Sequence, residues 1–194
     1  MYIMRLAADV FCILPRLRKR KGWSKMKKTS NDNKLRRLTY AAVFAAIVCV
    51  MTMIVKVPTP TKGYMNLGDV AVLLAGFMLG GVYGGAAAGV GSALADLFAG
   101  YMVYAPATFV IKWLTAAVAA IIFGKTRRGT AAAILSGVVG EAVMVLGYFV
   151  FEIFISGGAA AALTGVPMNL LQGAVGVILS TLLYALLKNK IDLN

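Results

Sequence analysis

Residues 64–81 read YMNLGDVAVLLAGFMLGG, a stretch in which one carboxylate, Asp69, stands where an otherwise uninterrupted apolar run begins. Glycines spaced four apart then form two ladders: Gly76, Gly80 and Gly84, and Gly81, Gly85 and Gly89. Small residues at this spacing let helices pack closely inside a bilayer, where expulsion of water cannot drive association. The stretch therefore predicts tightly packed membrane helices. It leaves open whether Asp69 caps a helix or helps to build a site.

The composition of the whole chain favours the bilayer as its solvent. Of the 194 residues, 60% are hydrophobic and 14% are charged, which does not fit a soluble domain. The net charge of +13 is uneven, because twelve of the twenty basic residues lie in the first 37 positions. We interpret this charge as a sign of topology and of contact with lipid, and we expect no nucleic-acid partner.

The residues that usually bind metals and haem are scarce. The chain has no histidine, and its two cysteines, Cys12 and Cys49, lie in a basic leader and in an apolar run. Since zinc and haem sites depend on these side chains, we expect no metal, no cofactor and no disulfide.

Two regions are expected: a basic cytoplasmic leader at residues 1–37 and a membrane domain at residues 38–190. Met26 would make a natural start, so residues 1–25 could belong to an over-extended gene start. The membrane domain divides into apolar segments close to the about 20 residues that a helical span needs. There are six of them, at residues 38–57, 67–82, 83–101, 104–124, 130–155 and 161–187. The sequence thus predicts an all-α integral membrane protein, a bundle of six transmembrane helices.

Basic residues indicate the orientation of this bundle. The leader, the KTRR loop and the KNK tail are basic, whereas the three opposite loops contain only Lys62. Loops rich in lysine and arginine stay in the cytoplasm. We therefore expect a multi-pass protein of the plasma membrane with both termini cytoplasmic.

Polar side chains inside the apolar segments are the candidates for function, because each costs several kcal/mol in hydrocarbon unless it is paired or wet. Residues three, four, seven or eleven apart share a helix face. Three polar stripes follow: Tyr104, Thr108 and Lys112; Glu141, Tyr148 and Glu152; and Asn169 and Gln172. All lie in the outer half of the expected bundle. This one-sided cluster predicts a cavity that opens from outside rather than a conduit through the membrane.

Several of these residues have simpler interpretations. Asp69 could only cap its helix, Asp96 and Lys112 could form a structural ion pair, and Glu152 could reach the outer interface. Glu141 and Lys112 are the hardest to explain without a function, because they lie deepest. We therefore expect these two to contact a ligand.

Two alanine pairs in the first segment have the small-xxx-small spacing: Ala41 with Ala45, and Ala42 with Ala46. Such pairs serve either packing within a bundle or the docking of another membrane subunit. The sequence leaves both interpretations open.

Residues 66–113 resemble the substrate-binding S component of energy-coupling factor (ECF) vitamin transporters. The NLGD start, GSALAD with a following GY, and YAPAT-x-x-IK are similar to the riboflavin-type group, which also contains predicted pyridoxine and hydroxymethylpyrimidine binders. The likeness extends over residues 36–190. The resemblance implies a non-enzymatic six-helix bundle that captures a vitamin at its outer face under the first extracellular loop, PTPTKGYMN. A transmembrane coupling subunit and two ATPase subunits would then deliver the vitamin.

By position, the resemblance and the polar stripes together predict the residues of such a site. Substrate binding is assigned to Asn66, Asp96, Tyr104, Lys112, Glu141, Tyr148, Asn169 and Gln172, the loop and rim to Lys62, Tyr64 and Asp69, and subunit docking to Ala41, Ala42, Ala45 and Ala46. The excess of carboxylates favours pyridoxine or hydroxymethylpyrimidine, then riboflavin. The alternative is a stand-alone secondary transporter of a small polar solute, which would need polar groups accessible from both sides.

Overall fold

The structure of the protein is a computed structural model, and it describes residues 30–126 and 129–188. The possible over-extended start and most of the predicted leader lie outside these residues. The described helices are α2 (Ser30–Ile54), α3 (Gly68–Phe98), α4 (Ala105–Lys125), α5 (Thr130–Ile155), α6 (Ala159–Leu163) and α7 (Val166–Leu187). Within the described ranges, five helical segments are long and apolar enough to cross a membrane, with α6 and α7 taken as one.

The number of candidate membrane-spanning helices differs from the predicted six because of α3. It joins the predicted second and third spans, but Gly80 interrupts it with a φ of 80° and a ψ of −179°. A Cβ added at Gly84 would lie 2.4 Å from the backbone oxygen of Ala75. Residues nine apart in a continuous helix are about 13 Å apart, so the chain reverses at Gly80. The α3 segment is a helical hairpin with legs at residues 68–79 and 81–98.

The first loop contains the only strands in the described part of the chain, beside the predicted helices. Strands β1 (Lys56–Pro58) and β2 (Tyr64–Asn66) pair antiparallel, with Val57 opposite Met65. The turn between them is closed by two backbone hydrogen bonds between Thr59 and the segment 62–63. We call residues 56–66 the β-hairpin.

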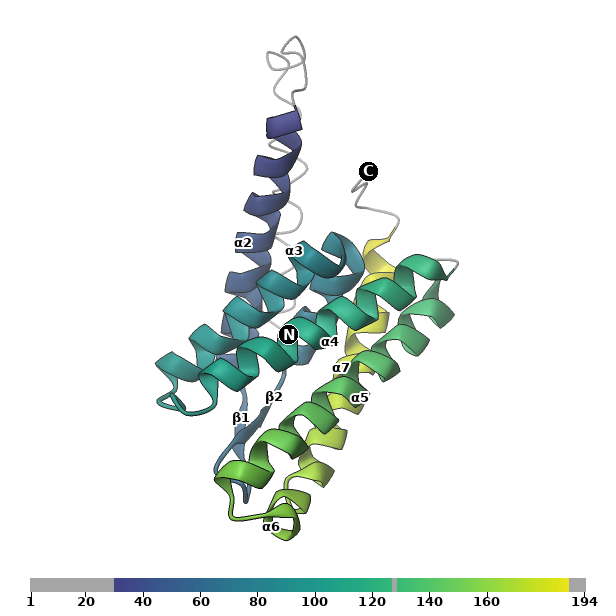
Figure 1. Cartoon of the computed structure of the whole chain (residues 1–194). Coiled ribbons are helices and arrows are strands. Elements are labelled where there is room, and N and C mark those ends of the chain that lie inside the picture. The colour runs from purple at the N-terminus through teal and green to yellow at the C-terminus, as the bar shows by residue number, and fades with distance from the viewer. Residues whose placement is uncertain (1–29, 127–128, 189–194) are drawn as a thin grey trace.

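The bundle is elongated, and different elements lie at its two ends (Figure 1). The first turns of α2 and the last turns of α7 lie toward one end, and the β-hairpin and α6 lie at the other. The observed helices agree closely with the predicted segments 104–124 and 130–155. The first helix begins earlier than predicted. Residues 30–37, which were expected to belong to the leader, form the first turns of α2.

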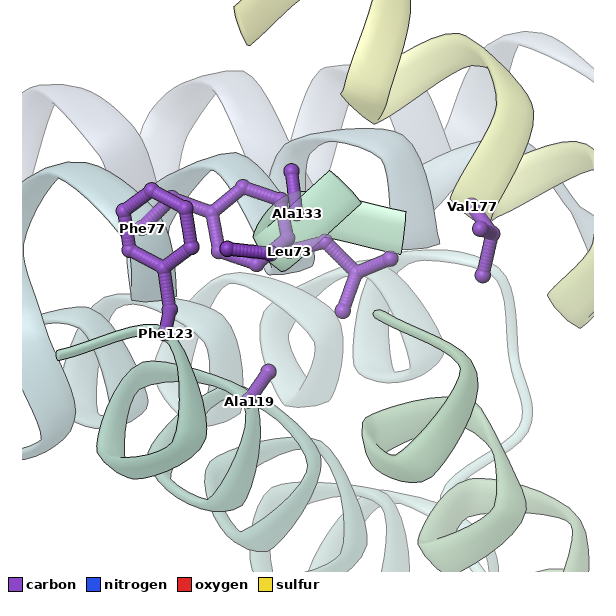
Figure 2. Close-up of a cluster of buried hydrophobic side chains, with 7 residues drawn as sticks. Leu73, Phe77, Ala119, Phe123, Ala133 and Val177 are labelled. Carbon is purple, nitrogen blue, oxygen red and sulfur yellow. The ribbon is translucent and has the colours of Figure 1, made fainter. Parts of the chain in front are cut away.

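An apolar core fills the half of the bundle that is remote from the β-hairpin. Figure 2 shows Phe77 beside Phe123, with Ala119 and Ala133 close by. The two phenylalanine rings have centroids 4.8 Å apart, and the ring of Tyr184 lies 5.1 Å from that of Phe123. Polar side chains are therefore left to gather in the other half, next to the β-hairpin.

Candidate functional site

A polar pocket lies between the β-hairpin and the adjacent ends of α3, α4, α5 and α7. Its empty volume, including space open to solvent, is about 360 Å³. The lining residues are Thr59, Gly63, Tyr64, Asn66, Asp96, Tyr104, Thr108, Tyr148, Glu152, Asn169 and Gln172. Three tyrosines, two carboxylates and three amides thus line one space.

One wall carries the first carboxylate. The hydroxyl of Tyr64 donates a 2.6 Å hydrogen bond to Oδ1 of Asp96. Burial, followed by this hydrogen bond, raises the pKa of Tyr64 well above its usual range, so the phenol stays a donor. The second oxygen of Asp96, Oδ2, is buried and has no partner among the described residues. That oxygen is free to accept a hydrogen bond from a ligand.

Glu152 of α5 repeats this arrangement. The hydroxyl of Thr61 donates to Oε1 of Glu152 at 2.8 Å, while Oε2 is buried and has no partner within residues 30–126 and 129–188. The hydroxyl of Tyr104 donates to the backbone oxygen of Thr61 at 2.6 Å. Burial, then the nearby charge of Glu152, raises the pKa of Tyr104 to about 12. Both contacts fasten the turn of the β-hairpin over the pocket.

Tyr148 forms part of the inner wall of the pocket. Its hydroxyl donates to Oγ1 of Thr108 at 3.1 Å, and Nζ of Lys112 lies 5.3 Å from the centre of its ring. An ammonium at this distance is attracted by the face of the ring. The lysine itself is only 2% exposed and lies one turn deeper along α4 than Thr108.

Beneath the pocket, Lys112 forms a buried ion pair with Asp69. The distance from Nζ to Oδ1 is 2.5 Å. The amide Nε2 of Gln172 donates to the other carboxylate oxygen at 2.6 Å, and its Oε1 accepts a 2.7 Å hydrogen bond from the backbone N–H of Asn66. Gln172 therefore joins the end of the β-hairpin to the ion pair.

The interpretation of Asp69 as a helix cap is wrong. At the start of α3 the backbone N–H of Gly68 donates to Oδ1 of Asn66 and not to Asp69. The Asp69 carboxylate accepts from Lys112 and Gln172 instead. The interpretation of Asp96 and Lys112 as an ion pair is wrong as well, because Tyr64 and not Lys112 contacts the Asp96 carboxylate. A buried ammonium binds the nearest carboxylate at its own depth, and on α3 that is Asp69.

Glu141 lies in the same buried region, and neither of its carboxylate oxygens has a partner among the described residues. It does not line the pocket. The predicted ligand contacts of Lys112 and Glu141 thus belong to a layer beneath the pocket and remain predictions.

The structure brings most of the other predicted site residues together. Six of the eight predicted substrate-binding residues line the pocket: Asn66, Asp96, Tyr104, Tyr148, Asn169 and Gln172. Of the predicted rim residues, Tyr64 lines the pocket, Lys62 is exposed at the tip of the β-hairpin and Asp69 is buried. Sequence reasoning missed Thr59, Thr61 and Gly63, which have no helical spacing to mark them. Their role in binding is a prediction, like that of the residues found.

The two alanine pairs of α2 face different ways. Ala41 is 7% exposed and packs in an apolar cluster, with Ala45 against it. A Cβ at Gly91 of α3 would lie 2.4 Å from the backbone oxygen of Ala45, so the two helices touch there. Ala42 and Ala46 are exposed on the outer face of α2.

No three side chains of the types His, Cys, Asp and Glu converge within the described ranges. The residues that line the pocket instead carry hydroxyls, amides and two carboxylates, each of which has one oxygen without a partner in the described part of the chain. This arrangement suits reversible binding of a small solute that donates hydrogen bonds.

The fold and the pocket define a multi-pass helical membrane protein with a solute site at one end of its bundle. Residues 32–189 match the family described as the S component of the ECF-type riboflavin transporter. The chain belongs to this family of substrate-binding transporter subunits, which are not enzymes.

Individual proteins agree with this assignment. An uncharacterized protein of Pyrococcus woesei is 38% identical over 147 residues, which cover 74% of this chain and 96% of that protein. The solved S component of a bacterial ECF transporter matches with a TM-score of 0.67 and 28% identity, over 80% of this chain and 97% of that one. The S component for biotin from an ECF-type ABC transporter matches with a TM-score of 0.64 over 86% of this chain and 97% of that one. At 18% identity, this last likeness concerns the fold alone.

Proposed function

We propose that the protein captures a small vitamin or vitamin precursor, pyridoxine or hydroxymethylpyrimidine, in the pocket beneath the β-hairpin. One observation carries the proposal: Asp96 and Glu152 both line a pocket that no cationic side chain lines, and each has a buried carboxylate oxygen without a partner among the described residues. Buried acceptors of this kind favour a ligand that brings hydrogen-bond donors. A single ring with a protonatable nitrogen and hydroxymethyl groups supplies them.

The aromatic lining supports a planar ring. Tyr64, Tyr104 and Tyr148 come from three different elements and face the same pocket. Aromatic rings stack or meet edge to face with a flat ligand, while hydrogen bonds to the two carboxylates would fix its in-plane orientation.

Riboflavin is the second candidate, and the family match over residues 32–189 favours it. Its three-ring system and ribityl chain are larger than a single-ring vitamin. Displacement of the β-hairpin from the contacts that Thr61 makes with Glu152 and Tyr104 would enlarge the pocket for them.

Calorimetric titration of the purified protein with pyridoxine, hydroxymethylpyrimidine and riboflavin separates the candidates. We expect one of the two small ligands to bind most tightly. We also expect Asp96→Asn and Glu152→Gln each to weaken binding, because a hydrogen bond to a charged group contributes about 1.5–3 kcal/mol, roughly 10- to 100-fold in Kd. Lys125→Gln at the exposed end of α4 is the control and should bind as the wild type does. Tight binding of riboflavin alone would replace our substrate, and binding of none would refute capture in this pocket.

We further propose that the pocket opens to the outer face of the plasma membrane. A transmembrane coupling subunit with two ATPase subunits of an ECF module then delivers the vitamin. The one-sided distribution of polar groups supports this, since the half of the bundle around Phe77 and Phe123 is apolar. The purified chain alone in proteoliposomes should bind the vitamin without moving it across the bilayer. Downhill uptake by the chain alone would instead support a secondary transporter.

A further inference from the structure

The capture of a vitamin leaves one buried acid without a role. Glu141 of α5 is 5% exposed, lies at the depth of the Asp69–Lys112 ion pair, and has two oxygens with no partner in the described part of the chain. An isolated charge at such a position costs several kcal/mol in a bilayer. The side chain must therefore be neutral or compensated.

Two glycines of α7 make the space for this carboxyl group. A Cβ added at Gly173 would lie 3.3 Å from Oε2 of Glu141, and one at Gly176 would lie 3.3 Å from Oε1. The same added Cβ at Gly176 would lie 3.0 Å from the Cβ of Asp69. The two acidic side chains thus meet on either side of one glycine.

The charges around Glu141 do not balance if every acid is ionised. Its charged neighbours are Asp69 from α3 and Lys112 from α4. The helix α7 presents glycines and the amide of Gln172, and α6 consists of alanine and leucine. Lys112 is bound to Asp69 at 2.5 Å, and the second oxygen of Asp69 is taken by Gln172. One ammonium therefore faces two acids, and its contact is with Asp69.

We propose that Glu141 is a proton-binding site that controls how firmly the β-hairpin is anchored. In the anchored state Glu141 holds the proton, and the cluster is neutral with Asp69 and Lys112 charged. When the proton leaves to solvent, the new carboxylate competes for Lys112 and leaves one negative charge in excess. Water drawn in from the pocket then displaces Gln172 from the backbone N–H of Asn66, and the β-hairpin loosens.

The protonation of Glu141 can be measured without any vitamin, so its failure is separate from failure of the capture proposal. The chain contains only two glutamates, Glu141 and Glu152, so labelling the glutamate side-chain carboxyl carbon with ¹³C gives two NMR signals. We expect one at the position of a neutral acid at neutral pH, absent from Glu141→Gln. If that variant does not fold, Glu152→Gln assigns the signals by elimination. An ionised signal for Glu141 overturns the proposal.

Tryptic cleavage after Lys62, which is exposed at the tip of the β-hairpin, measures the anchoring. As pH rises through the titration of the Glu141 signal, cleavage of the wild type should accelerate several-fold relative to Glu141→Gln, because glutamine mimics the neutral acid at every pH. Both proteins are assayed at the same pH, which cancels the pH dependence of the protease. An unchanged ratio of the two rates would refute the link between Glu141 and the β-hairpin.

Discussion

At the scale of single residues, Asp69 shows what sequence reasoning can and cannot reach. Its position ahead of an apolar run predicts a helix start, and α3 begins one residue before it. The partner of Asp69 is 43 positions away in the chain, and no local spacing predicts that contact. Lys112 needs an anion at its own depth, but the choice of Asp69 over Asp96 is made by the packing of α3 on α4.

The ion pair predicts a large effect of removing its cation. Lys112→Met should lower the free energy of unfolding by about 3–5 kcal/mol, because it leaves Asp69 as a buried, uncompensated charge. Thermal unfolding in detergent measures the loss. Lys125→Met, on the same helix but exposed, should change the stability little.

The double variant Lys112→Met with Asp69→Asn gives a sharper version of this test. Asparagine can still accept a hydrogen bond from Gln172, and no buried charge remains, so the double variant should regain most of the stability that Lys112→Met loses. If the two losses simply add, then Asp69 and Lys112 do not interact as described.

Tyr104 predicts a loss of stability in alkali. Its pKa in the folded protein is raised to about 12, against about 10 for an unperturbed tyrosine. The folded state thus holds this proton more firmly than the unfolded state. The stabilising contribution is complete below the unfolded pKa and is lost as pH rises through the folded one. Tyr104→Phe should remove this part of the pH dependence in chemical unfolding, and an unchanged alkaline profile would contradict the assignment.

At the scale of elements, the glycine ladders of α3 were predicted as packing motifs but not as the two sides of one hairpin. The sequence GGVYGG offers several glycines for a break, and hydropathy does not choose among them. The structure uses Gly80, whose φ of 80° is costly for any other residue. The β-hairpin was likewise predicted only as a loop, because strands of three residues leave no alternating pattern long enough to recognise.

The reversal of the chain within α3 can be tested with three glycine-to-alanine variants. Gly84→Ala should destabilise the protein by about 1–3 kcal/mol, because the new methyl group would overlap the backbone of the other leg. Gly80→Ala should cost a similar amount through backbone strain, about 1–3 kcal/mol. Gly124→Ala is the matched control, since a Cβ there meets nothing within 4 Å and alanine favours helix. Urea unfolding of the three variants gives the comparison. Equal stability of Gly84→Ala and Gly124→Ala would refute the close contact of the two legs.

At the scale of the whole molecule, the sequence predicted which residues gather in the polar half of the bundle better than which of them contact each other. Helical spacing put Tyr104 with Thr108 and Asn169 with Gln172, and all four line the pocket. The spacing could not separate pocket residues from the layer beneath them, because both lie on the same helix faces. Lys112 continues the stripe of Thr108 one turn deeper, where packing and not periodicity decides what it contacts.

The outer face of α2 bears on the proposed assembly with a coupling subunit. Ala41 and Ala45 pack inside the bundle, so they stabilise the protein itself. Ala42 and Ala46 are exposed on the same helix, and small exposed residues four apart let another helix approach closely. The docking that we propose therefore belongs to the second pair of alanines rather than to all four.

Bulk on the outer face of α2 should separate vitamin uptake from vitamin binding. Ala42→Trp should abolish uptake in cells that contain the ECF module, while the purified variant binds its vitamin with an unchanged Kd, because the side chain points away from the pocket. Leu146→Trp on α5, where the wild-type leucine is 63% exposed, adds similar bulk to another outer face and should leave uptake intact. Ala41→Trp should instead lower the thermal stability, since its side chain is buried. If Ala42→Trp bound poorly or both exposed variants transported normally, this face of α2 would have no part in docking.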